Sequence, residues 1–140
     1  MKIELISASS EQLKTPPSTL SGVEFGTLFS DHMFCMEWDE GKGWHSAKIK
    51  PYGPLKLEPS SMVLHYAQMS FEGLKAYKIE SEQHALFRPR ENFKRMNRTA
   101  QRICLPELDV EEVLDSLKQL LRLESGWVPS EDGTSLYVRP

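Results

Sequence analysis

Apolar residues recur at helical spacing between Asp109 and Gly126, and this is the clearest periodic stretch of the chain. One face of it consists of Val113, Leu114, Leu117, Leu120 and Leu121. Asp109 and Glu112 resemble a capping box, in which a side-chain oxygen accepts a hydrogen bond from a free backbone N–H group of the first turn. Gly126 is placed to end the helix. The pattern predicts a helix whose apolar face packs against the core.

A second helical pattern begins near Pro89, a residue that suits the first turn of a helix. Its apolar face is formed by Phe93, Met96, Ala100 and Ile103. Leu105 and Pro106 end the pattern, since proline cannot continue a helix. We therefore expect a helix from about residue 89 that turns this face toward the core.

A shorter helix is expected in residues 60–72. Ser60 and Ser61 can cap its first turn. Its apolar positions at helical spacing are Leu64, Ala67 and Phe71. Gly73 can adopt the left-handed conformation that often ends a helix, so the pattern predicts a helix that runs up to this glycine.

Short apolar runs separated by polar turns predict strands at residues 2–6, 33–38, 44–50, 74–79, 85–88 and 134–139. Glycine-containing polar clusters at residues 39–43 and 130–133 indicate turns, and a polar turn is expected between the strands at 74–79 and 85–88. Strands and helices in this order predict an α+β fold, with a mainly antiparallel sheet packed against two to three helices.

The chain divides into an N-terminal arm and one domain. Residues 1–22 show no sustained period apart from the short strand, so we expect a flexible arm. The remaining residues, 23–140, form one domain, because 140 residues with 39% hydrophobic content suffice for a single core.

Composition excludes several classes of partner. Seventeen basic and twenty acidic residues give a formal net charge of −3, which argues against a broad nucleic-acid surface. No run approaches the roughly 18 apolar residues of a membrane span, and no signal-peptide pattern is present, so we expect a cytoplasmic location and no membrane partner. Cys35 and Cys104 lie far apart in apolar surroundings, which favours two buried thiols over a disulfide and offers no metal-ligand spacing.

Four ordered segments carry a resemblance to a known family. They read FGTLFSDHMFCMEW, HYAQMSFEGLKAY, FRPRENFKRMNRTA and SLYVRP, and together they cover about residues 25–140. The chain resembles the branched-chain amino acid aminotransferases, which are fold-type IV pyridoxal phosphate enzymes. The second and third segments would also suit D-amino acid transaminases and aminodeoxychorismate lyases, whereas FGTLFSDHM and SLYVRP narrow the resemblance to the branched-chain group. A rival outside the class is a non-catalytic binding or assembly module.

The resemblance implies the smaller N-terminal domain of an enzyme that uses pyridoxal 5′-phosphate. Its substrates would be the branched-chain amino acids leucine, isoleucine and valine, with 2-oxoglutarate and glutamate as the other pair, and it would act as a homodimer. Transamination needs a lysine that holds the cofactor covalently and moves a proton. In the family this lysine lies in a second domain, beyond Pro140, and neither Lys75 nor Lys78 matches it. We therefore assign no catalytic residue here, and we expect the chain alone to be an inactive fragment, truncated before the lysine-bearing domain.

Arg95 is the candidate for binding the cofactor. A guanidinium group offers a planar fork of donors that matches a phosphate group and keeps its charge. The resemblance places the family's phosphate-binding arginine at this position of the ENFKRMNR motif. The alternative is that Arg95 pairs with Glu91, four residues earlier, on an exposed helix face.

Five residues are candidates for binding the substrate: Phe25, Tyr66, Phe71, Tyr137 and Arg139. By resemblance, Tyr66 corresponds to a tyrosine that enters the active site of the neighbouring subunit. Phe25, with Phe29 as the competing choice, and Phe71 correspond to aromatic residues lining a pocket for an aliphatic side chain.

Tyr137 and Arg139 are two residues apart on a predicted strand, so their side chains share one face. The resemblance implies that Arg139 receives the side-chain carboxylate of glutamate or 2-oxoglutarate. The alternative is that Arg139 is an edge-strand residue in solvent.

Overall fold

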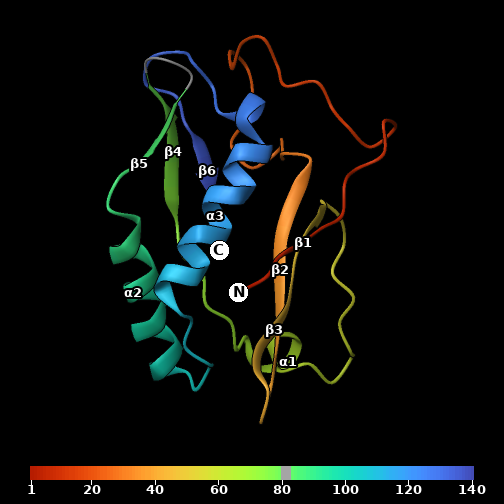
Figure 1. The fold of residues 1–140 in the computed structure, drawn as a ribbon, viewed down its shortest axis with the longest axis vertical. Helices are drawn as coiled ribbons and strands as arrows, with labels where there is room; N and C mark the ends of the chain where they lie inside the picture. The colour runs from red at the N-terminus through yellow and green to blue at the C-terminus, as the bar shows by residue number, and fades with distance from the viewer. Residues whose placement is uncertain (80–82) are drawn as a thin grey trace.

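The computed structural model describes residues 1–79 and 83–140, and Figure 1 shows how its helices and strands are arranged. In chain order the elements are β1 (Glu4–Leu5), β2 (His32–Asp39), β3 (Gly43–Pro51), α1 (Met62–Tyr66), β4 (Leu74–Lys78), β5 (His84–Leu86), α2 (Pro89–Arg102), α3 (Val110–Leu123), the 3₁₀ helix η2 (Ser125–Trp127) and β6 (Leu136–Val138). The predicted α+β class is confirmed. The turn predicted between β4 and β5 includes residues 80–82, which lie outside the described part of the chain.

The strands form two three-stranded sheets, with orders β1-β3-β2 and β5-β4-β6. β1 runs parallel to β3, and the other described pairings are antiparallel, so the mainly antiparallel character is confirmed. The two sheets stand on either side of α3 in the view of Figure 1. One helix thus packs between two separate sheets, where the sequence had suggested a single sheet.

The hydrophobic core forms around α3. Its predicted apolar face packs against β4 and α2 with four of its five residues buried and Leu120 half-buried. The buried cluster consists of Leu74, Ala76, Phe93, Val113, Leu114, Leu117, Leu121 and Val128. Phe93 and Leu114 are only 1% and 2% exposed. Full burial of such side chains stabilises a fold by about 1.5–3 kcal/mol each, and α3 supplies four of the eight residues of this cluster.

Helix α3 begins as the sequence predicts, but it does not end where the sequence predicts. The Asp109 side chain accepts hydrogen bonds from the backbone N–H groups of Glu111 and Glu112, both at 3.0 Å, as the capping prediction requires. The Glu112 carboxylate, however, accepts from the N-terminal amino group of Met1 at 2.8 Å. The helix ends at Leu123, before Gly126, because the chain tightens there into η2.

The prediction for α1 is wrong in its extent. The helix ends at Tyr66, and the left-handed residue after it is Ala67, with φ of 50°. Gly73 serves a different purpose: a Cβ atom there would lie 2.9 Å from Cζ of Tyr137 and closer still to its hydroxyl oxygen. The glycine is therefore required by a neighbour on β6, a contact that local spacing does not reveal. No side-chain capping bond is made by Ser61.

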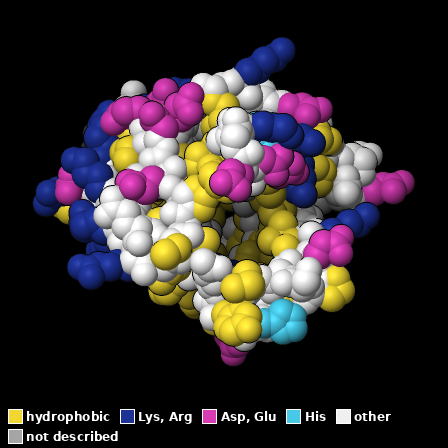
Figure 2. Space-filling view, turned by 90° about the horizontal axis from the view of Figure 1, so that it is seen from below, with side chains coloured by type: hydrophobic (Ala, Val, Ile, Leu, Met, Phe, Trp, Pro, Cys, Tyr) yellow, Lys and Arg dark blue, Asp and Glu magenta, His cyan; other side chains and the backbone are white. Residues whose placement is uncertain are grey.

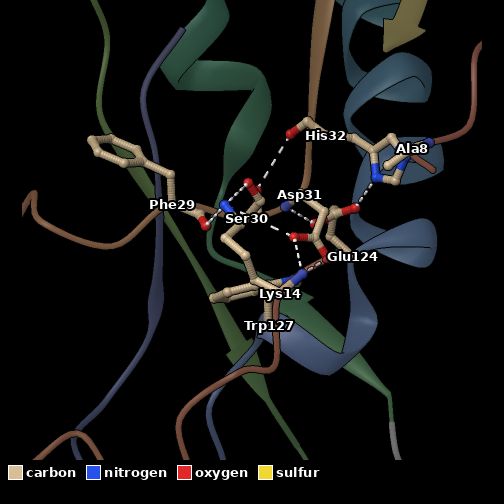
Figure 3. A network of polar contacts seen from close by, with 8 residues as sticks. All are labelled: Ala8, Lys14, Phe29, Ser30, Asp31, His32, Glu124 and Trp127. Carbon is tan, nitrogen blue, oxygen red and sulfur yellow. Dashed lines mark hydrogen bonds and ion pairs between the residues drawn. The ribbon is translucent and has the colours of Figure 1, made fainter. Parts of the chain in front are cut away.

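The N-terminal arm lies against the domain through a polar network that Figure 3 shows in close-up. The backbone N–H of Ala8 donates to Nε2 of His32 at 3.0 Å, and that of Lys14 donates to Asp31 at 3.0 Å. The Lys14 ammonium group also donates to the carbonyl of Phe29 at 2.7 Å. These bonds join the arm to the start of β2, while the boundary at residue 22 and the arm's flexibility stay predictions.

The two thiols are not buried as predicted. Cys35 is half-buried on β2, and Cys104 is exposed, with a left-handed φ of 57° in the turn after α2. Both are free. Among the described residues no cluster of His, Cys, Asp or Glu is suited to a metal ion, and no helix has the length and apolar character to cross a membrane.

Candidate cofactor and substrate site

Residues 71–73, which connect the α1 region to β4, lie at the centre of the candidate site. The backbone N–H of Glu72 donates to the carbonyl of Pro140 at 3.0 Å, which ties this segment to the strand end after β6. The absence of a side chain on Gly73 admits the Tyr137 ring. One short segment therefore contacts both α2, through the Glu72 carboxylate, and β6.

Arg95 on α2 forms a two-bond ion pair with Glu72. Its Nε donates to one carboxylate oxygen at 2.8 Å and its Nη2 to the other at 2.5 Å. The carboxylate also accepts from the backbone N–H of Gly73 at 2.8 Å, and the Asn92 amide lies at 3.4 Å. Glu91, the local partner considered from sequence, instead accepts from Lys94 at 3.0 Å.

The two members of this pair differ sharply in exposure. The Glu72 side chain is 6% exposed, whereas the Arg95 side chain is 60% exposed. The hydrogen bond from Arg95 lowers the pKa of Glu72, with help from Gly73 and Asn92 and against the effect of burial. The same bond raises the pKa of Arg95. Basic side chains gather on the α2 side of the molecule in Figure 2.

The Arg95 guanidinium retains donors for a ligand. It has five N–H bonds, and the pair with Glu72 uses the one on Nε and one on Nη2. The two N–H bonds of Nη1 and the second one of Nη2 form the outer edge of the group, which this pair leaves available. An exposed, permanently charged fork of this kind matches the oxygens of a phosphate group. The residues present therefore fit a phosphate anchor.

A cavity of about 680 Å³ lies between the loop before β2, helix α3 and the C-terminal strand β6. Its walls are mostly apolar, and the candidate substrate residues Phe25, Tyr137 and Arg139 are among them. The rings of Phe25 and Tyr137 meet edge to face, with centroids 5.1 Å apart. Figure 2 shows, from below, a hollow in the molecule with hydrophobic side chains inside it.

Tyr137 and Arg139 both line this cavity, as do their neighbours Leu136 and Val138. That the side chains of Tyr137 and Arg139 share one strand face stays a prediction. Lys75 on β4 pairs in register with Tyr137 and lines the cavity too. Phe29, the competing choice for Phe25, is also in the wall, but its ring stacks on Tyr52 at 4.9 Å. Of the two phenylalanines, Phe25 is the one in ring contact with Tyr137.

The structure leaves three candidate residues outside the cavity. Among the described residues that line it, Tyr66, Phe71 and Arg95 are not found. Tyr66 and Phe71 are 75% and 68% exposed, so in this chain they contribute no wall. Arg95 is linked to the cavity indirectly, through Glu72 and the neighbouring contact between residue 73 and Tyr137.

Sequence reasoning missed the buried acidic groups of this region. Glu72 entered only as part of the segment HYAQMSFEGLKAY. An acidic residue between a phenylalanine and a glycine in an apolar stretch was nevertheless a usable signal of a buried carboxylate. Glu124 and His32 also line the cavity, and Figure 3 shows their contact. Because Nε2 of His32 accepts from Ala8, Nδ1 carries the proton and donates to Glu124 at 2.5 Å.

The chain is similar to known proteins both in fold and in sequence. No protein-family model matches the sequence. The fold resembles part of the crystal structure of Escherichia coli branched-chain amino acid aminotransferase, with a TM-score of 0.52 and 24% identity, over 65% of this chain and 28% of that one. The chain therefore has an α+β fold found within an aminotransferase.

Several known proteins are more similar to this chain in sequence than that solved structure is. The chain is 54% identical to branched-chain-amino-acid transaminase 1 of Bacillus subtilis, over 91% of this chain and 35% of that protein. It is 46% identical to branched-chain-amino-acid aminotransferase 2 of the same organism, over 100% of this chain and 37% of that protein. A cytosolic relative from Caenorhabditis elegans is 46% identical over 99% of this chain and 33% of its own length. The chain is homologous to the branched-chain amino acid aminotransferases, and it spans about a third of the length of these relatives.

Proposed function

We propose that this chain is the N-terminal domain of a pyridoxal 5′-phosphate-dependent branched-chain amino acid aminotransferase. The complete enzyme would transfer the amino group of leucine, isoleucine or valine to 2-oxoglutarate. The observation that carries the proposal is 54% identity over 91% of the chain to a branched-chain-amino-acid transaminase. Coverage of about a third of each relative supports the role of one domain within a longer enzyme.

In this proposal Arg95 holds the phosphate group of the cofactor with the guanidinium edge that the ion pair leaves open. The bound cofactor supplies an electron-withdrawing ring that eases removal of a proton from the substrate carbon. The lysine that holds the cofactor and moves that proton belongs to a second domain. This chain therefore contributes binding and orientation, and it has no catalytic residue of its own.

The cavity wall supplies the substrate contacts. Phe25 and Tyr137 present ring surfaces that suit an aliphatic side chain, while Arg139 offers a cation for the side-chain carboxylate of glutamate or 2-oxoglutarate. Tyr66 and Phe71 would complete the pocket against the second domain and the neighbouring subunit of a homodimer. Their high exposure in this chain supports that assignment, because apolar surface of this size is normally covered.

The test is a substrate profile of the full-length protein, which we expect to act in the cytoplasm. Leucine, isoleucine and valine should serve as amino donors to 2-oxoglutarate, and D-alanine and aminodeoxychorismate should not react. A preference for either of the latter would place the protein in a different branch of the fold-type IV enzymes. Absence of transfer from every donor, with cofactor supplied, would support a non-catalytic binding or assembly module.

A further inference from the structure

The buried carboxylate of Glu72 has no function in the site as assigned so far, yet it makes two hydrogen bonds to the proposed phosphate anchor. We infer that Glu72 is a positioning residue, which fixes the Arg95 guanidinium so that its outer edge faces the cofactor phosphate. This inference rests on the proposed function, and it adds a residue to which that function assigned no task.

Glu72 is well suited to hold another side chain in place, because it is itself fixed from several sides. Its backbone N–H is bound to the carbonyl of Pro140 at 3.0 Å. Its carboxylate accepts from the backbone N–H of Gly73 at 2.8 Å and has the Asn92 amide at 3.4 Å. Asn92 in turn donates to the carbonyl of Gly73 at 3.1 Å. A buried acceptor with this support moves little.

Arg95 needs such support because it is a long side chain in an exposed position. Its side chain is 60% exposed, and without a partner it would occupy many rotamers. Restricting those rotamers before the ligand arrives lowers the entropy lost on binding. The Nε–Nη2 edge is the one that Glu72 occupies, so the Nη1 side remains for phosphate oxygens.

A second pair on α2 provides a matched comparison. Arg90 donates to Glu111 through Nε at 2.6 Å and through Nη2 at 2.8 Å, which is the same two-bond geometry. Here, however, both side chains are more than half exposed. The geometry is shared, but only the Arg95 pair of these two is anchored to a buried acceptor. We therefore expect a binding effect from loss of Glu72 and none from loss of Glu111.

The experiment measures dissociation constants of pyridoxal 5′-phosphate and of pyridoxal, which lacks the phosphate, with the full-length protein. Glu72→Gln should weaken pyridoxal 5′-phosphate about tenfold, equivalent to about 1.4 kcal/mol, and leave pyridoxal unchanged. Glu111→Gln should leave both constants unchanged. In an Arg95→Ala background, Glu72→Gln should produce no further loss, because the two residues act as one unit.

Several results would overturn the inference. If Glu72→Gln binds pyridoxal 5′-phosphate as tightly as the wild type, or more tightly, while Arg95→Ala binds it weakly, Glu72 does not position the anchor and the proposed function stands. Equal weakening of both ligands by Glu72→Gln would show a general structural effect. Retention of pyridoxal 5′-phosphate by Arg95→Ala would overturn the inference and the proposed phosphate anchor together.

A second variant covers the case in which Glu72→Gln does not fold. Glu72→Asp keeps the negative charge but shortens the reach by one carbon, so it should weaken pyridoxal 5′-phosphate about threefold to tenfold and leave pyridoxal unchanged. Wild-type affinity for both ligands in this variant would also refute the positioning role. Circular dichroism of each variant establishes that the measured protein is folded.

Discussion

Replacing Glu124 with leucine should destabilise the chain, because this carboxylate joins the end of α3 to the start of β2 and, through His32, to Ala8 of the N-terminal arm. Its two oxygens accept from Nδ1 of His32 at 2.5 Å and from the backbone N–H of Asp31 at 2.7 Å. The Glu124 side chain is 3% exposed, so water cannot replace these bonds. A leucine at this position leaves two buried donors without an acceptor.

The magnitude follows from those two donors. A buried donor left unsatisfied costs about 1–3 kcal/mol, so the two donors together should lower the free energy of unfolding of Glu124→Leu by roughly 2–6 kcal/mol. Glu124→Gln keeps one acceptor oxygen but turns an amide NH₂ group toward the other donor, so we expect a smaller loss of about 1–3 kcal/mol. Glu124→Leu should therefore lose more unfolding free energy than Glu124→Gln, and this order tests the argument as well as the two magnitudes do.

Urea unfolding of the 140-residue chain at pH 7, followed by tryptophan fluorescence, measures both changes. Trp127 is a suitable reporter because its indole N–H donates to Asp31 within the network, at 3.1 Å. The control is Glu131→Gln, which removes an exposed carboxylate that accepts from the Leu20 N–H at 2.9 Å and should cost less than about 0.5 kcal/mol. If Glu124→Leu unfolds within 0.5 kcal/mol of the control, the network does not stabilise the fold as we argue.

Four further predictions concern the core, the ion pair and the proposed enzyme. Leu114→Ala should lower the free energy of unfolding by about 2–5 kcal/mol in urea, and a loss below 1 kcal/mol would contradict the central packing of α3. Because Arg95 lowers the pKa of Glu72, the stability that the Glu72 carboxylate contributes should be full above about pH 4.5 and should fall as the pH drops toward the lowered pKa. The difference in unfolding free energy between wild type and Glu72→Gln should therefore shrink on acidification below pH 4.5, and a constant difference would refute this linkage. In the full-length enzyme, Arg139→Ala should raise the KM for 2-oxoglutarate more than the KM for leucine, and equal increases would argue against a carboxylate anchor. The 140-residue chain mixed with pyridoxal 5′-phosphate should not transaminate leucine. Measured turnover would contradict the proposal that the cofactor-holding lysine belongs to a second domain.

Elements governed by local chemistry could be predicted from the sequence. The α3 start was predictable because Asp109 caps the two N–H groups beside it, and the apolar spacing fixed which face is buried. The end of α1 was not predictable in the same way. The glycine expected to end it is needed for the approach of Tyr137, a residue that local rules do not connect to it.

The candidate site likewise contains residues that the sequence predicted and contacts that it did not predict. Tyr137 and Arg139 line the cavity as candidate substrate residues should, while the shared strand face that alternation predicts for them stays a prediction. The partner of Arg95 was missed because Glu72 lies 23 residues away and meets it only through the packing of the segment before β4 against α2. Burial of the cysteines was also misjudged, since apolar neighbours in sequence do not determine which side of a turn faces solvent.

The central claim is that this chain supplies the phosphate anchor and pocket wall to a lysine outside it. Borohydride reduction of the full-length protein with its cofactor fixes the pyridoxyl group to the lysine that holds it, and peptide mass spectrometry then identifies that lysine. The account predicts a label on a lysine outside residues 1–140. A label on Lys75, or on any other lysine of this chain, would contradict it.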